Sequence, residues 1–153
     1  MQLALYEPDI PQNTAAILRT AACFCVPTHV VGPTGFDLSP RAVRRAGLDY
    51  ADAVILHRHN GWQEFVSACC GRLVLFTTQS AQPAHRFEFG PDDTLVFGSE
   101  SAGAPGFVHD ACHERVRIAM APGMRSLNLA VAVGIGISTA LTRTGILDTG
   151  HYS

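Results

Sequence analysis

Short apolar runs recur along the chain, and polar or glycine-rich segments separate them. Residues 73–76 and 94–97 are the clearest runs, because nearly every position in them is apolar. A strand of this kind is buried on both faces, which is typical of a parallel sheet that helices cover. Longer stretches with a helical spacing of apolar residues alternate with these runs. The pattern therefore predicts an α/β fold, with a mostly parallel sheet flanked by helices.

The alternation also sets bounds for the elements. Strands are expected at residues 2–6, 28–32, 53–57, 72–78, 94–98 and 116–120. Helices are expected at residues 13–26, from Ser39 and Pro40 onward, and at residues 61–70, 105–112 and 127–142. Asn13 is the expected N-cap of the first helix. Its buried face is expected to carry Ala16, Ile17, Thr20 and Phe24. Residues 79–93 are expected to form a loose loop, and residues 149–153 a frayed tail.

Polar side chains gather at three strand-to-helix junctions, which are residues 7–14 with Arg19 further on, residues 95–105 and residues 116–129. The carboxyl ends of strands in α/β proteins are where ligands bind, so these junctions are candidate site segments. Their distinctive members are Arg19, Gly98, Glu100, Arg125, Ser126 and Asn128.

Each junction also has a purely structural interpretation, which the sequence leaves open. Gly98 permits a tight turn as well as the approach of a ligand. Ser126 or Asn128 suits the N-cap of the last helix. Glu100 and Arg19 fit solvated positions on a loop and a helix.

Two phosphate-binding motifs, G-x-G-x-x-G and G-x-x-x-x-G-K-[ST], do not occur in the sequence. A ligand held by its phosphates is therefore not expected, whereas a nucleoside such as S-adenosylmethionine stays open. No metal site is expected either. The pairs His57 with His59 and Cys112 with His113 lack the spacing and the second half of a zinc site.

Composition narrows the class of protein. The chain has 153 residues, of which 47% are hydrophobic and 16% charged, and we expect one domain over residues 1–153. Its formal net charge is −2, so an RNA partner would have to meet local arginines rather than an overall positive field. Five cysteines without a C-x-x-C pair favour buried, unpaired thiols in a reducing cytoplasm.

The apolar run at residues 127–141 is too short and too polar for a membrane span, so no membrane partner is expected. Gly134 and Gly136 within it indicate close approach of another backbone, either inside the fold or across a dimer.

The three junctions, in this order, resemble the SPOUT RNA methyltransferases, specifically their 2′-O-ribose branch. The matching pieces are residues 13–19, 95–105 and 118–129. Residues 5–13 and 44–50 add a resemblance to the minimal, single-domain TrmL-like members that modify the wobble nucleotide of tRNA. The likeness runs nearly end to end. Each motif alone is weak, but five in register form a strong signal.

The resemblance implies a C-terminal deep trefoil knot, S-adenosylmethionine as cofactor, and a homodimer whose site spans the interface. The implied cofactor-binding residues are Phe76, Thr77, Thr78, Gly98, Glu100, Ile118, Met120, Ser126 and Leu127. The implied catalytic residues are Arg19, Glu100, Ser126 and Asn128. The anticodon stem-loop of tRNA would meet Arg19, Arg41, Arg44, Arg45 and Arg125.

The implied reaction is 2′-O-methylation of the wobble cytidine or uridine. Arg19 of a neighbouring subunit would orient the 2′-hydroxyl, because a guanidinium stays protonated. Ala102 and Ala119 depart from the family pattern, which often has arginine and proline there. Three alternatives stay open: another tRNA or rRNA ribose as target, a knotted RNA-binding protein without catalysis, and a flavodoxin-type nucleotide-binding protein.

Overall fold

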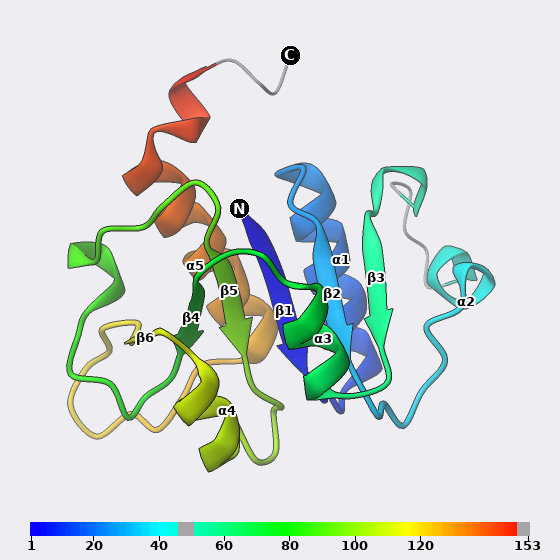
Figure 1. The fold of residues 1–153 in the computed structure, drawn as a ribbon, viewed down its shortest axis with the longest axis horizontal. Helices are drawn as coiled ribbons and strands as arrows, with labels where there is room; N and C mark the ends of the chain where they lie inside the picture. Colours follow the sequence, from blue (N-terminus) through cyan, green and yellow to red (C-terminus); the bar gives the residue numbers. More distant parts are fainter. Residues whose placement is uncertain (46–50, 150–153) are drawn as a thin grey trace.

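Six strands form one sheet in which every pair is parallel, in the order β3-β2-β1-β5-β4-β6 (Figure 1). The computed structural model describes residues 1–45 and 51–149. Predictions that concern residues 46–50 and 150–153, namely part of the motif at 44–50 and most of the expected tail, lie outside the described residues. The strands are β1 (Gln2–Tyr6), β2 (Thr28–Val31), β3 (Leu56–His59), β4 (Leu73–Phe76), β5 (Thr94–Phe97) and β6 (Glu114–Val116). The predicted parallel sheet is confirmed.

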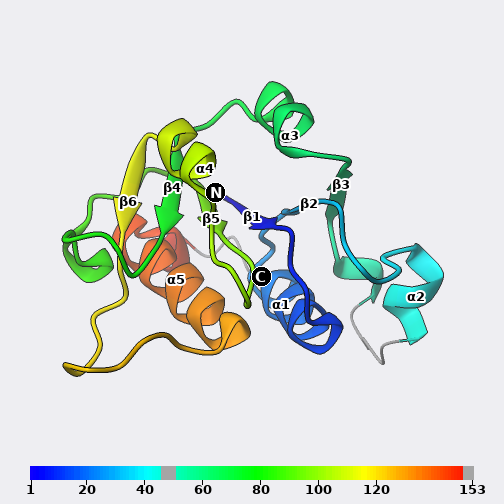
Figure 2. The same ribbon diagram turned by 90° about the horizontal axis from the view of Figure 1, so that it is seen from below.

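Helices cover both faces of this sheet (Figure 2). They are α1 (Pro11–Cys23), α2 (Pro40–Arg45), α3 (Trp62–Ala68), α4 (Gly106–Ala111) and α5 (Leu129–Thr144). In Figure 2, α1 and α5 lie side by side on one face, and α3 and α4 lie on the other. β6 lies at the edge of the sheet. After it, the chain returns across the face that α1 covers, so that α5 packs against α1 and β5.

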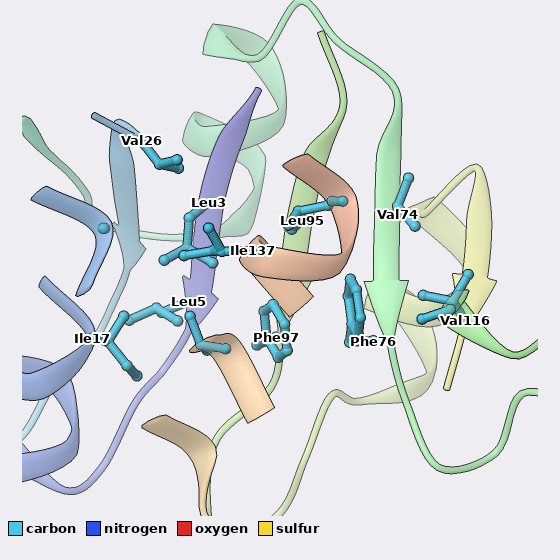
Figure 3. Close-up of a cluster of buried hydrophobic side chains, with 14 of the residues drawn as sticks. Leu3, Leu5, Ile17, Val26, Val74, Phe76, Leu95, Phe97, Val116 and Ile137 are labelled. Atoms are coloured by element: carbon cyan, nitrogen blue, oxygen red, sulfur yellow. The ribbon is translucent and has the colours of Figure 1, made fainter. Parts of the chain in front are cut away.

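The larger part of the core lies between the sheet and the pair α1 and α5. Buried side chains from β1, β4 and β5 meet Ile17 of α1 and Ile137 of α5 there (Figure 3). A Cβ atom added at Gly136 would lie 2.8 Å from Cζ of Phe97, so α5 rests directly on the aromatic rings below it. The close approach at Gly136 is thus made by aromatic side chains of the same chain, and the prediction that another backbone comes close here is wrong. At Gly134 an added Cβ would meet nothing within 4 Å in this chain.

The first helix starts earlier than predicted, and it buries a different face. Proline occupies the first turn of α1, where its missing N–H costs nothing, and Ile10 is the N-cap residue. Asn13 is therefore inside the helix, and the prediction that it caps the helix is wrong. Ala16 is exposed. The buried residues of α1 are Thr14, Ile17, Leu18, Ala21 and Ala22.

The two edge strands were misplaced by the sequence pattern, because an edge strand is only partly covered and need not be apolar. β3 begins later than predicted and carries exposed His57 and Arg58. β6 ends at Val116, so Ile118 and Met120 lie in the loop beyond it. That loop continues by pairing with another segment, since the Arg117 N–H donates to the Gln82 carbonyl at 2.9 Å.

Residues 79–93 are packed rather than loose. Ala84, Phe87 and Phe89 from this segment are buried in the main core. Its far end is held by Arg72, whose guanidinium donates to both carboxylate oxygens of buried Asp93 at 2.9 and 2.8 Å. The prolines of the segment therefore shape a fixed loop, and the prediction of a loose region is wrong.

All five cysteines are free, as expected, but the expectation that they are buried is wrong for Cys23, Cys25 and Cys70, which are exposed. In the part of the chain that the structure describes, no helix has the length and apolar character needed to cross a bilayer.

Candidate active site

A cavity of about 620 Å³ lies at the carboxyl ends of the central strands. Residues that follow β4, β5 and β6 line it, together with the segment that leads into α5. Chain order reverses next to it, because β2 and β3 extend the sheet beyond β1 on one side, and β4 and β6 extend it beyond β5 on the other. Parallel α/β sheets bind ligands at such a reversal. The volume suits a molecule of nucleoside size.

The residues predicted to hold a cofactor all line this one cavity, and so does Asn128. They are Phe76, Thr77, Thr78, Gly98, Glu100, Ile118, Met120, Ser126 and Leu127. They come from four segments that are well separated in the sequence, and the sheet brings these segments to one edge. What each residue does toward a ligand stays a prediction.

One wall of the cavity is apolar. The rings of Phe76 and Phe97 stack with their centroids 4.6 Å apart, and Ile118, Leu129 and Ala132 border the same space. A flat, weakly polar ring system such as adenine loses little hydration when it enters a wall of this kind.

The opposite side is polar and is organised around Glu100. The main-chain N–H of Asp9 donates to Oε2 of Glu100 at 2.9 Å, and Nδ2 of Asn13 donates to Oε1 at 3.0 Å. Both carboxylate oxygens therefore accept hydrogen bonds from the first junction. The side chain of Glu100 is held in one orientation at the rim of the cavity.

Asn13 also connects to the third junction. Nδ2 of Asn128 donates to Oδ1 of Asn13 at 3.0 Å. The other end of the Asn128 side chain accepts from the N–H groups of Ala130 and Val131, at 2.9 and 3.3 Å. Asn128 is thus the N-cap of α5, as its structural interpretation predicts, and it also takes part in a chain of hydrogen bonds that runs from Glu100 through Asn13 to α5.

The structure explains why position 98 is a glycine. A Cβ at this position would lie 2.2 Å from the carbonyl carbon of Gly103, because the loop after β5 folds back on itself. The N–H groups of Ser99 and Gly103 each donate to the carbonyl oxygen of the other, at 3.1 and 3.0 Å. The close approach that Gly98 permits is therefore that of its own loop, while the residue still lines the cavity.

Four of the predicted arginines, Arg19, Arg41, Arg44 and Arg125, do not line the cavity of their own chain, and the side chain of Arg45 lies outside the described part of the structure. Arg19 is exposed on α1, and Arg125 is exposed in the loop before α5. Arg41 and Arg44 are exposed on α2, and Arg44 lies 3.5 Å from Asp52. Arg45 ends α2. The structure does not gather the four described arginine side chains into the cavity that holds Glu100 and Asn128.

Sequence reasoning missed three residues. Asn13 was taken for a cap although Pro11, two positions earlier, marks the first turn of the helix. Asp9 contacts the loop after β5, and His109 of α4 lines the cavity, and neither has a sequence signal of its own. Of the departures from the family pattern, Ala102 lines the cavity and Ala119 is exposed. Among the described residues, no three His, Cys, Asp or Glu side chains converge as metal ligands do.

The parallel sheet with a cavity of nucleoside size at its point of reversal defines a class, the α/β proteins that bind a nucleoside-containing ligand at their strand ends. The sequence pattern of the SpoU rRNA methylase family matches residues 1–138, and the chain belongs to this family.

Individual relatives are similar over almost the whole length. The tRNA (cytidine(34)-2′-O)-methyltransferase of Beijerinckia indica is 47% identical over 148 residues, which cover 95% of this chain and 92% of that protein. The enzyme with the same name from Escherichia coli K12 is 34% identical over 148 residues, with 95% and 94% covered.

Solved structures share the fold. One that concerns the 2-OH methylation of C/U34 on tRNA superposes with a TM-score of 0.86 at 38% identity, covering 93% of this chain and 94% of that one. An AdoMet-bound rRNA methyltransferase from Sinorhizobium meliloti superposes with a TM-score of 0.82 at 25% identity, covering 92% of this chain and 55% of that one.

Proposed function

We propose that this protein is a tRNA 2′-O-methyltransferase, which transfers a methyl group from S-adenosylmethionine to the ribose of the wobble cytidine or uridine, nucleotide 34. The main support is the cavity in which all the predicted cofactor residues meet Asn128. The identity of 47% to an enzyme named for this reaction adds to it. The protein would act as a single domain in the cytoplasm.

The cavity suggests how the cofactor lies. Its adenine would lie against the apolar wall that includes Phe76 and Ile118, near Met120, and would form hydrogen bonds with main-chain groups of the surrounding loops. Thr77, Thr78, Gly98, Ser126 and Leu127 would line the rest of its path. The bound cofactor supplies an electrophilic methyl group on a positively charged sulfur, so the protein has to bring a ribose hydroxyl into line with it.

The fixed polar groups serve that alignment. Glu100 and Asn128 are tied together through Asn13, so they present one rigid edge to the substrate. Ser126 lies next to this edge and would bind the cofactor. Arg19 of a second subunit would orient the 2′-hydroxyl and a neighbouring phosphate with its planar guanidinium. It would not take up the proton, because an arginine stays protonated.

A homodimer is part of this proposal. Val131 and Ile135 are one helical turn apart on α5, and Leu127 lies in the loop just before the helix. The three side chains are 50%, 38% and 38% exposed. Gly134, where an added Cβ would meet nothing in this chain, lies in the same stretch. An apolar stripe with a small residue in it suits the close approach of a second helix. Arg19 lies on α1, the helix that packs beside α5, so the same interface would carry it toward a partner's cavity.

The remaining expectations belong to the same proposal. Arg41, Arg44, Arg45 and Arg125 would contact phosphates of the anticodon stem-loop, which lends a protein of net charge −2 a local positive surface. The C-terminal trefoil knot that the resemblance implies is also part of this proposal. The backbone of Arg117 pairs with Gln82 and Ala84, which holds the segment after β6 against the loop after β4.

The experiment is methyl transfer from labelled S-adenosylmethionine to total tRNA, followed by nucleoside mapping. We expect label in 2′-O-methylcytidine or 2′-O-methyluridine at position 34, and loss of label in a Glu100→Ala, Asn128→Ala double variant. Label at another ribose would assign a different substrate. Absence of transfer, despite binding of the cofactor in calorimetry, would contradict the proposed activity.

A further inference from the structure

Two loops face each other beside the cavity and come from neighbouring strands. β1 and β5 pair in register from Gln2 with Thr94 to Leu5 with Phe97, so the segments that follow them leave the sheet together. The first segment turns sharply at Glu7, which has a φ of 44°. This is left-handed backbone, which a residue with a side chain adopts only at a cost. Contacts further along the loop have to offset that cost.

Asp9 provides such contacts both as a hydrogen-bond donor and as an acceptor. Its own N–H donates to Oε2 of Glu100 at 2.9 Å. Its Oδ2 accepts from the N–H of Ser101 at 3.3 Å and from the Ser101 hydroxyl. The hydrogen bond from the Ser101 hydroxyl is the largest cause that lowers the pKa of Asp9, which favours the charged form. Residue 9 thus holds both Glu100 and the residue after it.

The carboxylates of Asp9 and Glu100 lie close together, and other contacts have to offset their repulsion. Asp9 and Glu100 repel each other when both are ionised. The N–H of Asp9 on one carboxylate, and the N–H and hydroxyl of Ser101 on the other, offset this repulsion. Asp9 does not line the cavity, and its hydrogen bonds lead to the loop that carries Glu100.

We infer that Asp9 is a positioning residue for the reaction: by clamping Ser101 it holds the loop after β5 so that Glu100 keeps its place at the cavity. This inference rests on the proposed function. Without the Asp9 carboxylate, Ser101 loses its acceptor and the loop at residues 99–103 gains freedom. Glu100 would then sample orientations that are not productive.

The test compares Asp9→Ala and Asp9→Asn with the control Asp92→Asn. The control removes an exposed carboxylate just before β5, at the amino ends of the strands and away from the cavity. We expect Asp9→Ala to lower kcat by roughly ten- to a hundredfold, since a small misplacement of a catalytic group has effects of this size. The Kd for S-adenosylmethionine and the KM for tRNA should change by less than about threefold. Asp9→Asn should recover part of the loss, because its amide oxygen still accepts from Ser101.

The decisive readout is the dependence on Glu100. In a Glu100→Ala background, Asp9→Ala should change kcat by less than about twofold, because the group that it positions is gone. An undiminished loss in that background, or an equal loss in Asp92→Asn, would overturn the inference. If the wild-type protein does not methylate tRNA, the proposed function fails. The clamp is then judged by amide hydrogen exchange at Ser101: faster exchange in Asp9→Ala supports it, and unchanged exchange overturns it.

Discussion

At the scale of single residues, the charge of Glu100 can favour one form of the cofactor over another. Both donors to its carboxylate, the N–H of Asp9 and the amide of Asn13, are neutral groups. These donors therefore fix the orientation of the carboxylate without placing a positive charge beside it. A fixed anion at the rim of the cavity is complementary to the positively charged sulfur of S-adenosylmethionine and has no such attraction for the neutral sulfur of S-adenosylhomocysteine.

This difference predicts the behaviour of Glu100→Gln, which removes the charge and keeps the size. We expect the variant to weaken binding of S-adenosylmethionine by roughly threefold to tenfold, the effect of about 1 kcal/mol from one partly solvated charge. Binding of S-adenosylhomocysteine should change little. Isothermal titration with both compounds measures the two affinities side by side. Equal losses for both would mean that Glu100 acts on the shape of the site and not through its charge.

Gly136 and Gly134 offer a matched pair of substitutions two residues apart on α5. At Gly136 an added Cβ would come within 2.8 Å of Phe97 and 3.2 Å of Phe76, and both rings are buried and stacked. We expect Gly136→Ala to lower the free energy of unfolding by about 1–3 kcal/mol through overpacking. In the single chain, where nothing lies within 4 Å of the added Cβ, Gly134→Ala should be neutral, or stabilising by up to about 1 kcal/mol, because alanine is the better helix former. Urea denaturation compares them, and an equal loss at both positions contradicts this expectation.

At the scale of elements, sequence patterns work best where burial is complete. β1, β4 and β5 were found almost at their true bounds, because nearly all their side chains are covered on both faces and hence apolar. The edge strands β3 and β6 were displaced, because their exposed positions carry His57, Arg58 and Glu114 like any loop. The start of α1 was misread because an asparagine looks like a cap, although Pro11 sets the first turn.

The candidate site, too, could be predicted only in part. Its loops could be located, because glycines and polar residues directly after apolar runs mark strand ends. Its internal connections could not. The bonds of Asp9 and Asn13 with Glu100 join residues about ninety apart, which only the pairing of β1 with β5 brings together. The packing of residues 79–93 could not be predicted for a similar reason, since their anchor Asp93 needs Arg72, which lies just before the neighbouring strand β4.

At the same scale, histidines on the outer strands β2 and β3 should make the stability of the fold depend on pH. His29 of β2 is only 6% exposed and shares hydrogen bonds with His59 of β3 at 2.9 Å and Gln2 of β1 at 3.0 Å. Its ring also stacks on His57 and contacts the edge of Phe65 of α3. Burial, together with the nearby His57 and His59, lowers the pKa of His29 to about 4. Burial lowers the pKa of His59 as well, against the pull of Glu64.

A folded pKa below the unfolded value of 6.5 means that the unfolded chain binds the proton first. The contribution of His29 to stability is therefore fully present above pH 6.5 and is lost as the pH falls toward 4. We expect a loss on the order of 2 kcal/mol, less than the full shift would give, because neighbouring rings can move apart. Urea denaturation from pH 7.5 to 4.5 measures it. His29→Gln keeps a polar side chain without titration and should flatten this dependence; an unchanged slope would assign the effect to other groups.

At the scale of the whole molecule, the distribution of charge and apolar surface favours a site that two chains complete. The cavity contains a carboxylate and amides from its own chain, whereas Arg19 is exposed on α1 and does not line it. The apolar stripe of Leu127, Val131 and Ile135 begins beside the cavity and runs along α5. A second copy docked on this stripe would both cover apolar surface and bring a guanidinium to the rim. Dimerisation would then be a condition for activity and not only for stability.

Mixing two strongly impaired variants tests this arrangement directly. Arg19→Ala keeps its own Glu100, and Glu100→Ala keeps its own Arg19. If Arg19 serves the partner's cavity, each mixed dimer contains one site in which both residues are intact. After unfolding and refolding an equimolar mixture, about half of the dimers are mixed, so activity should return to about a quarter of the wild-type level. If Arg19 serves its own cavity, every site lacks one residue and no activity returns. A third mixture, with Val131→Glu added to both variants, should stay inactive, because a charge on the stripe prevents association. Activity that returned in this mixture would show that the chains meet through another surface.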